Sequence, residues 1–328
     1  MKKSYKKIVL ATITLALAFI IFFVLRSKNT IDVKNLTAKT TEKPKLAVAP
    51  LSGIACENSA ARPWAVMMAS DPEARPLAGI GQADMVFEMP VTESGVTRMM
   101  AVFQCTHPSE FGSIRSARED FLPYVLGLDV IYMHWGGEHG ILEKLGQHVA
   151  DNIDCLKLDG TTCLRKKSIP MPHNGYSTGD LFSAKAKALG YDTNQSSVKY
   201  EHTKSKSQGI VTVPTLYSDA NSVTWTYDPA TNLYSRSRAG KPEIDRGTNK
   251  QVTASNIIVL QTTSTYVSIL YNRVKTVGSG SATVYQNGIS IPAKWQKTSD
   301  KSKLVFLDVA GKEIPFVPGT TWIEIVTQ

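Results

Sequence analysis

The residues best suited to chemistry in this chain are concentrated in one stretch, residues 83–120. Two short apolar runs in this stretch are typical of neighbouring strands, and the polar turn between them carries Glu88 and Glu93. An arginine-rich segment, GSIRSARED (112–120), follows the second run closely. Because neighbouring strands of a hairpin lie about 4.8 Å apart, this layout predicts that both polar clusters meet at one end of a sheet. We therefore expect the functional face of the protein there.

Arg115 and Arg118 are the strongest candidates for binding a ligand. They are three residues apart, so they would point to one face if they opened the helix that the sequence predicts over 117–126. Two guanidinium groups at a helix N-terminus suit a phosphate or carboxylate ligand. The alternative is that they brace the loops by pairing with acidic neighbours, namely Glu88, Glu93 or Asp120. The predicted ligand site also includes flanking residues of the same stretch, namely Arg98, Ser116 and Asp120.

Glu88 and Glu93 form a candidate pair of catalytic carboxylates, of the kind that glycoside hydrolases use. A turn separates them, so the sequence leaves the distance between the two carboxyl groups open. Acidic residues in turns are more often solvated or ion-paired than catalytic. Enzymatic activity on a glycan or on its phosphate linkage therefore stays an alternative to simple binding.

The histidine-containing motifs do not predict a metal site. His134, Glu138 and His139 form the pattern HxxxEH, which is not the spacing of zinc-binding helices. Gly136-Gly137 would also interrupt a single helix containing all three. We expect His134 at the end of a strand, bonded to backbone or close to the ligand.

A second polar pair, His173 and Asn174, follows the rigid turn at residues 170–172. We predict that this pair brings polar groups to the same end of the sheet, where it joins the ligand site. The alternative is that the two residues cap the next helix, predicted over 177–189. No cofactor is expected, because the glycines of residues 278–280 are not followed by the helix that a dinucleotide loop requires.

The positive charge of the chain is concentrated at its N-terminus. The formal net charge is +9, and residues 1–28 supply six of these charges with no acidic residue among them. The rest of the chain carries only +3, which is small for a protein that binds a phosphate backbone. The sequence therefore argues against a nucleic-acid partner.

A membrane anchor explains the basic N-terminus. Residues 8–25 are an uncharged apolar run of 18 residues, roughly 27 Å long as a helix, which is enough to cross a thin bilayer. Four lysines precede the run and two basic residues follow it, so residues 1–7 are predicted to be cytoplasmic. No small-residue cleavage site follows, so we predict an uncleaved single-pass signal anchor. Residues 26–50 are polar and lack an apolar period, which indicates a stalk outside the cell.

The four cysteines all lie beyond the predicted anchor, in a compartment that permits disulfides. Cys155 and Cys163 bracket a predicted hairpin with Asp159-Gly160 at its tip, which favours a bond between them. Cys56 and Cys105 then pair by elimination, although four cysteines allow three pairings. The alternative is that the thiols are free and buried.

The fold class predicted from the pattern is α+β, with two domains. Strand-like and helix-like segments alternate over residues 51–195, which predicts an N-terminal α/β-type mixed sheet. Residues 205–328 contain short β-type runs separated by turns and no long helix, which predicts an all-β C-terminal domain. Asn287-Gly288 between two of these runs is a strong two-residue hairpin signal.

Several of these motifs resemble the YerB-like bacterial envelope proteins, a two-domain family of unknown function. In the N-terminal half the resemblance is carried by residues 62–104, GSIRSARED (112–120), YMHWGG (132–137) and MPHNGYST (171–178). In the C-terminal half it is carried by residues 224–245, ASNIIVLQ (254–261) and GTTWIEIV (319–326). The resemblance covers about 52–328 and implies the fold and an envelope location more than an activity. Many members are described as lipoproteins, whereas no cysteine closely follows the apolar run here.

The leading hypothesis from the sequence is a single-pass membrane protein whose domains face outwards and bind an anionic envelope ligand. A phosphorylated or uronic glycan and a lipid-linked phosphate both fit paired arginines. One alternative is an enzyme acting on envelope glycan or its phosphate linkage. Another is a scaffold that binds protein partners through the β domain. The sequence leaves the ligand and the oligomeric state open.

Overall fold

The computed structural model describes residues 46–194 and 198–327. The predicted cytoplasmic tail and the predicted membrane span, residues 8–25, lie outside this range, as does most of the predicted stalk. In the part of the chain that is described, no helix is long and apolar enough to cross a membrane. The chain from Leu46 to Gln328 is one compact unit.

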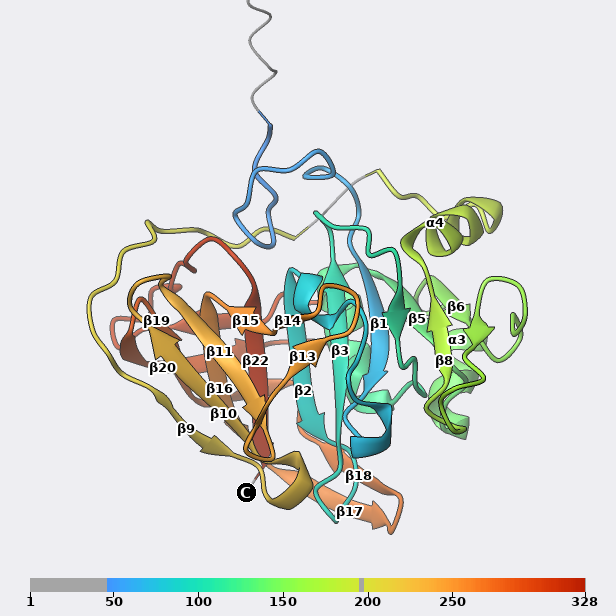
Figure 1. The fold of residues 1–328 in the computed structure, drawn as a ribbon. Coiled ribbons are helices and arrows are strands. Elements are labelled where there is room, and N and C mark those ends of the chain that lie inside the picture. Colours follow the sequence, from blue (N-terminus) through green and yellow to red (C-terminus); the bar gives the residue numbers. More distant parts are fainter. Residues whose placement is uncertain (1–45, 195–197, 328) are drawn as a thin grey trace, which may run out of the picture. The chain divides into compact units, whose positions relative to one another are not determined.

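One mixed sheet of ten strands runs through both predicted domains (Figure 1). Its strands are β1 (Trp64–Ala69), β2 (Met85–Pro90), β3 (Thr97–Phe103), β5 (Ile131–His134), β6 (Asn152–Asp154), β16 (Asn256–Thr262), β19 (Gly278–Gln286), β20 (Ile289–Lys297), β21 (Val305–Leu307) and β22 (Thr321–Thr327). Their order is β21-β20-β19-β16-β22-β2-β3-β1-β5-β6. The C-terminal strand β22 lies between β16 and β2 and pairs in parallel with both, so it joins the two halves of the chain.

Smaller sheets and hairpins hold the remaining strands. Five strands form a sheet in the order β12-β11-β10-β9, with β15 beside β11; they are β9 (Val213–Leu216), β10 (Val223–Asp228), β11 (Leu233–Arg238), β12 (Lys241–Pro242) and β15 (Thr253–Ala254). A three-stranded sheet contains β4 (Phe111–Gly112), β8 (Gly175–Ser177) and β7 (Leu164–Arg165). Two separate pairs are β13 (Ile244–Asp245) with β14 (Lys250–Gln251) and β17 (Ser264–Ser268) with β18 (Tyr271–Val274).

Helices are few in the described residues. The α-helices are α2 (Leu122–Leu128), α3 (His139–Gly146) and α4 (Gly179–Ala188). Single 3-10 turns are η2 (Pro72–Ala74), η3 (Ile80–Gln82), η4 (Glu119–Phe121) and η5 (Asp219–Asn221). All three α-helices lie in the N-terminal half. The protein is therefore mostly strands with few helices, and a mixed sheet is present as predicted.

The central strands bury side chains on both faces of the large sheet. Along β1, Trp64, Val66 and Met68 belong to one core, and the alternate residues Ala65 and Met67 belong to the other. Residues of α4 and of the five-stranded sheet cover the first face, and residues of α2 and α3 cover the second. Strands buried on both faces read as continuous apolar runs, which is why the sequence pattern located β1, β2 and β3.

Two predicted elements are wrong in their boundaries. The helix predicted over 117–126 starts only at η4 and α2, because Ala117 and Arg118 are extended; Arg118 has φ −130° and ψ 141°. The strand predicted over 267–271 instead spans the end of β17, a turn and the start of β18. In contrast, the predicted hairpin at Asn287-Gly288 is confirmed between β19 and β20. Both turn residues have positive φ, as this turn requires.

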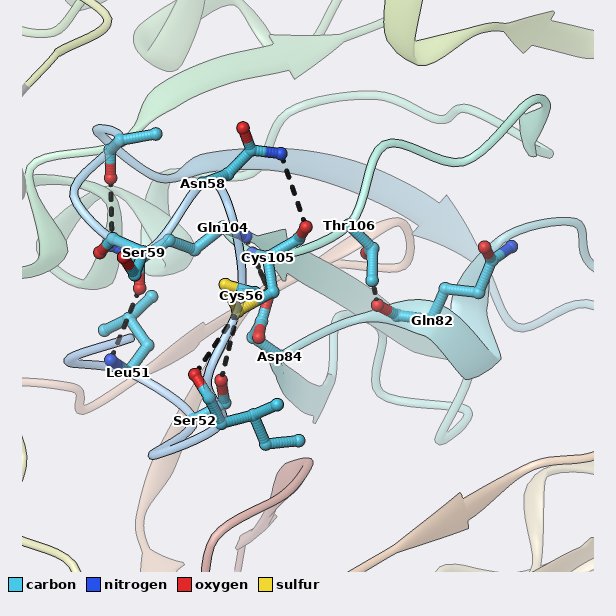
Figure 2. The surroundings of a disulfide bond; sticks show 12 residues. Leu51, Ser52, Cys56, Asn58, Ser59, Gln82, Asp84, Gln104, Cys105 and Thr106 are labelled. Carbon is cyan, nitrogen blue, oxygen red and sulfur yellow. Dashed lines mark hydrogen bonds between the residues drawn. A yellow bond between two sulfur atoms is a disulfide. The ribbon is translucent and has the colours of Figure 1, made fainter. Parts of the chain in front are cut away.

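Both favoured disulfides, Cys56–Cys105 and Cys155–Cys163, are present, with Cα–Cα distances of 5.6 and 5.4 Å. Figure 2 shows how the first bond ties the segment before β1 to the end of β3. The Asp84 carboxylate holds the backbone next to this disulfide, because it accepts hydrogen bonds from the N–H groups of Gln104 at 2.7 Å and of Cys105 at 3.0 Å.

Candidate functional site

Several positively charged side chains lie close together at the ends of β1 and β5 and the start of β3. We call Asp71, Arg98, Arg115, Arg118 and His173 the arginine cluster. Arg98 donates to Asp71 at 2.8 Å, and the His173 ring lies 3.9 Å from the same carboxylate. Arg115 and Arg118 lie close enough that their charges affect the pKa of Arg98. The carboxyl ends of parallel strands such as β1 and β5 are the usual place for ligands in sheets of this type.

The segment that carries Arg115 and Arg118 is held in place by its backbone. The N–H of Arg115 donates to the Met67 carbonyl of β1, and the Arg115 carbonyl accepts from Trp135, both at 2.9 Å. The N–H of Ala117 donates to the Gly136 carbonyl, also at 2.9 Å. The segment is thus an extended strap across the ends of β1 and β5. The predicted placement at a helix N-terminus is wrong for Arg115, whereas Arg118 directly precedes η4 as its N-cap residue. The strap brings the two arginines close together.

Arg98 is the buried member of the cluster. It is the second residue of β3, only 4% exposed, and lies opposite the last residue of β1, Ala69. Burial lowers the pKa of Arg98 to about 10, against the opposing effect of Asp71 and with the help of Arg115 and Arg118. Burial also raises the pKa of Asp71, but the charges of Arg98 and Arg115 outweigh it and lower that pKa.

Arg115 and Arg118 are half-buried and use few of their hydrogen-bond donors. Arg115 donates to the Pro172 carbonyl and Arg118 to the Ala117 carbonyl, each at 3.1 Å. The Arg118 guanidinium also lies over the Tyr271 ring, 5.1 Å from its centroid. Each guanidinium carries five N–H groups, so most of these donors have no acceptor among the described residues. Burial, together with Arg118, lowers the pKa of Arg115, while Asp71 opposes this effect.

None of the acidic residues that the sequence suggested as braces pairs with Arg115 or Arg118 in the described part of the chain. Asp120 accepts from Arg273 and from the backbone N–H of Val274, both at 3.0 Å. Glu88 is bound to Arg236 and Arg238. Glu93 is exposed and makes no ion pair with another described residue. The bracing alternative is therefore wrong for the carboxylates that the sequence suggested, and the acid that enters the cluster is Asp71.

The other predicted ligand residues divide between the cluster and its surroundings. Ser116 lies on the strap, and its hydroxyl has no hydrogen-bond partner among the described residues. His173 lies in the cluster, and its Nδ1 is buried without a hydrogen-bond partner in the structure. Asn174 points elsewhere, because its amide oxygen accepts from Arg165 at 3.0 Å. His134 is fully buried, with its ring facing the Gly136 carbonyl at 2.8 Å, and burial lowers its pKa.

The two candidate catalytic carboxylates are in different environments. Glu93 is exposed at the turn between β2 and β3 and lines a cavity of about 400 Å³. Glu88 is fully buried and accepts hydrogen bonds from Thr97, Arg236 and Arg238. A carboxylate that is fully buried in the core and bound to two arginines is a poor general acid or base, because a substrate cannot reach it. The geometry does not support the predicted carboxylate pair.

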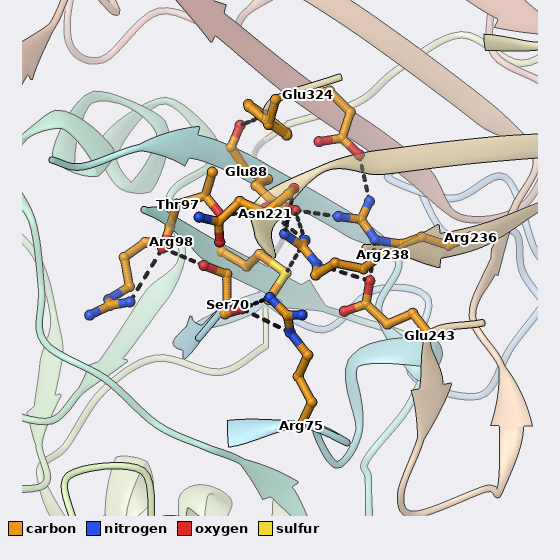
Figure 3. Close-up of polar contacts among 12 residues, drawn as sticks. Ser70, Arg75, Glu88, Thr97, Arg98, Asn221, Arg236, Arg238, Glu243 and Glu324 are labelled. Carbon is orange, nitrogen blue, oxygen red and sulfur yellow. Dashed lines mark hydrogen bonds and ion pairs between the residues drawn. The ribbon is translucent and has the colours of Figure 1, made fainter. Parts of the chain in front are cut away.

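Glu88 belongs to a second group of charges, which we call the buried charge cluster: Glu88, Arg236, Arg238, Glu243 and Glu324. Figure 3 shows these side chains converging from β2, β11 and β22, with Glu243 coming from the position between β12 and β13. Arg236 donates to Glu243 at 2.6 Å and also to Glu88 and Glu324, and Arg238 donates to Glu88 at 2.6 Å. Burial raises the pKa of Glu324, and the charge of Glu88 adds to this effect. Here each guanidinium is matched by carboxylates, unlike in the arginine cluster.

The sequence analysis missed β11 and therefore missed Arg236 and Arg238. The signal is the alternation in LYSRSR, where Tyr234, Arg236 and Arg238 occupy every second position and are the buried residues. A strand usually buries apolar side chains, whereas β11 buries two arginines. The sequence of β11 therefore looks polar, and its pattern does not predict a strand. Asp71 was missed for a simpler reason, because it stands in an Asp-Pro turn that was assigned to a loop.

Comparison with known proteins matches two family descriptions to this chain. "Protein of unknown function (DUF3048) N-terminal domain" covers residues 51–192, and "Protein of unknown function (DUF3048) C-terminal domain" covers residues 211–323. The chain belongs to the DUF3048 family. It is 31% identical over 320 residues to the protein described as "Putative lipoprotein YerB" of Bacillus subtilis (strain 168), covering 95% of this chain and 93% of that protein. The resemblance to YerB-like proteins is therefore confirmed.

A solved DUF3048 structure has the same fold. The crystal structure of YerB protein from Bacillus subtilis matches with a TM-score of 0.77 and 31% sequence identity, covering 86% of this chain and 97% of that chain. Neither description names a ligand or a reaction, so the function of this chain has to be argued from its own residues.

Proposed function

We propose that this protein is anchored in the cell membrane with its folded unit outside the cell, where the arginine cluster binds an anionic ligand of the envelope. The ligand would carry phosphate or carboxylate groups, as a phosphorylated glycan, a uronic glycan or a lipid-linked phosphate does. The anchor would be the single apolar run of residues 8–25.

Three observations support the location. The apolar run is preceded by more basic residues than follow it, which favours a cytoplasmic N-terminus. The similar Bacillus subtilis protein is described as "Putative lipoprotein YerB", and lipid-modified proteins are anchored to the membrane. The two disulfides are typical of proteins outside the reducing cytoplasm.

The observation that carries the binding proposal is the unmatched charge of the arginine cluster. Of the three arginines, Arg98 alone forms an ion pair with Asp71 among the described residues. The charge of Asp71 also acts on Arg115, and Arg118 has no ion pair with a described residue. Positive charges that lie close together repel each other unless a negative charge lies between them. In the buried charge cluster, by contrast, each arginine is ion-paired with carboxylates, as expected for arginines with a purely structural role. The free N–H donors of Arg115 and Arg118 suit the oxygens of a phosphate or a carboxylate.

Isothermal titration calorimetry with the full-length chain in a non-ionic detergent tests the proposal. The probes are pyrophosphate, glycerol phosphate and glucuronate, with glucose as the uncharged control. We expect at least one anionic probe to bind, and Arg115→Gln and Arg118→Gln each to weaken its binding roughly tenfold or more, as expected for a charge-assisted hydrogen bond.

A matched arginine variant separates binding from general charge effects. Arg165 is ion-paired with Asp159 at 2.6 Å, so Arg165→Gln should leave anion binding unchanged. Because Arg115 and Arg118 repel each other, Arg115→Gln should cost little or no stability. If no anion binds, or if the folded Arg115→Gln and Arg118→Gln variants bind it as tightly as the wild type, the proposal is wrong.

A further inference from the structure

A separate cavity of about 580 Å³ lies between the segment after β1 and the β11–β12 hairpin. Residues 72–77 form one wall, and residues 238–244 form the other. The size suits a small ligand, because ligand pockets typically measure about 300–1,000 Å³. No residue of the arginine cluster lines it, so the cavity is not part of the site proposed above.

One residue of the cavity wall is an ionised carboxylate with a buried oxygen that has no hydrogen-bond partner in the structure. Glu243 lines the cavity, and its residue is only 7% exposed. Its Oε2 accepts from Arg236 at 2.6 Å and from Arg238 at 3.3 Å, whereas its buried Oε1 has no hydrogen-bond partner in the structure. Figure 3 shows this second oxygen turned toward the side where Arg75 lies. Burial raises the pKa of Glu243, but Arg238 and Arg236 outweigh burial and lower it to about 2.

A ligand that donates a hydrogen bond to Oε1 of Glu243 would supply its missing partner. A buried acceptor without a hydrogen bond destabilises a folded protein, so this contact would be favourable. A charged donor fits better than a hydroxyl group. The charge of Arg75 acts on Glu243, but Arg75 donates to the Ser70 and Ala220 carbonyls and makes no hydrogen bond to Oε1, so a positively charged donor suits this ionised carboxylate. An ammonium group supplies both the donor and the charge.

Two cations at the cavity have capacity for a ligand carboxylate. Arg75 donates through Nε to the Ser70 carbonyl and through Nη2 to the Ser70 and Ala220 carbonyls, and its Nη1 has no partner among the described residues. Lys241 is exposed and makes no ion pair within the described part of the chain. The walls between these charges are apolar and rigid, and they include Pro72, Pro76, Leu77, Pro242 and Ile244.

We propose that this cavity binds a short peptide through its free amino group. The terminal ammonium donates to Glu243, the terminal carboxylate faces Arg75 and Lys241, and apolar side chains rest against the proline-lined walls. A dipeptide carries both terminal charges on a body of suitable size. This inference does not depend on the anion site.

Calorimetry with the full-length chain in detergent tests the peptide site. The probes are alanyl-leucine, its N-acetyl derivative, its C-terminal amide and, as a hydroxyl donor without charge, glucose. We expect alanyl-leucine to bind and N-acetylation to weaken binding roughly tenfold or more, because acetylation removes the ammonium group. The C-terminal amide should bind more weakly than the free acid.

Two surface variants keep the test independent of the buried cluster. Lys241→Gln should reduce the difference in affinity between alanyl-leucine and its C-terminal amide. Ala220→Trp should block the cavity and abolish peptide binding. Arg115→Gln, which lies outside the cavity, should change neither the affinity for alanyl-leucine nor its difference from the amide. The inference is overturned if alanyl-leucine does not bind or if the N-acetyl form binds equally well. It is also overturned if glucose binds in its place, or if Ala220→Trp leaves binding unchanged.

Discussion

Single arginines in this protein differ according to the acids that surround them. Arg236 and Arg238 are fully buried and each touches carboxylates, so their charges are matched inside the core. Arg115 and Arg118 are half-buried and donate only to carbonyl oxygens. The residue type is the same, but only the second pair has donors left for a ligand.

The charge of His173 should make anion binding depend on pH. Burial lowers the pKa of His173, Asp71 opposes this effect, and Arg115, Glu73 and Arg98 also lie within electrostatic range. At neutral pH the ring is therefore neutral, and protonation below its ordinary pKa near 6.5 adds a positive charge to the arginine cluster. We expect sulfate, whose own charge is constant in this range, to bind more tightly as the pH falls from about 7 to about 5.

Titration calorimetry of sulfate at several pH values, with the wild type and His173→Gln, measures this effect. The variant should bind sulfate with a much flatter pH dependence. An equal pH dependence in both proteins would show that another group is responsible.

Glu88 and Glu93 can be compared by their effect on the free energy of unfolding, because one is buried and the other is exposed. Glu88→Gln removes the buried charge that pairs with both Arg236 and Arg238, and leaves Arg238 only the longer contact of 3.3 Å to Glu243. It should lower the free energy of unfolding by about 3–5 kcal/mol. Glu93→Gln changes an exposed side chain and should stay within about 0.5 kcal/mol of the wild type. Urea unfolding of both variants gives these values. Similar losses for the two would contradict the structural role assigned to Glu88.

At the scale of elements, the strap and the hairpins are positioned by backbone contacts more than by helix or strand propensity. The strap carrying Arg115 is fixed by hydrogen bonds to β1 and to the residues after β5. The β19–β20 hairpin is fixed by its turn, in which Gly288 has a φ of +72° and lies against the Gly209 carbonyl.

Gly240 and Gly288 have the same φ, so replacing each with alanine distinguishes the cost of backbone strain from the cost of a steric clash. A Cβ at Gly288 would lie 2.3 Å from the Gly209 carbonyl oxygen, whereas a Cβ at Gly240, which also has a φ of +72°, would meet nothing within 4 Å. Gly240→Ala should cost only about 1–2 kcal/mol of backbone strain. Gly288→Ala adds a clash with backbone and should cost clearly more in thermal or urea unfolding. Equal costs would mean that the Gly209 segment moves aside freely.

At the scale of the whole molecule, the two halves matched by separate family descriptions share one sheet. β22, near the C-terminus, pairs with β2 from the N-terminal half, and Glu88 lies opposite Glu324 in this pairing. The buried charge cluster also takes its residues from both halves. Separating the halves would expose two long sheet edges and leave buried charges unmatched.

We therefore expect residues 46–204 and 205–328 not to fold when they are produced separately. Circular dichroism and size-exclusion chromatography of each fragment, alone and after mixing, measure this. Restored native-like signals on mixing would agree with the shared sheet. A cooperative thermal transition in either isolated fragment would contradict it.

The sequence by itself determined the features that depend on local pattern. The apolar runs of β1, β2 and β3, the Asn287-Gly288 turn and both disulfide pairs follow from residue alternation, turn chemistry and spacing along the chain. The arginine-rich segment was also recognised as a candidate site, because two guanidinium groups three residues apart suit a phosphate or carboxylate ligand.

Only the tertiary structure decided which charges meet. Glu88 and Arg238 are 150 residues apart, and Asp71 meets Arg98 only because the first residues of β3 lie beside the end of β1. Pairing between distant strands leaves no local signal, since it depends on which edges and faces are free after the nearer strands have paired. An arginine's role as structural ion pair or ligand donor is therefore set by the carboxylates that the fold places beside it.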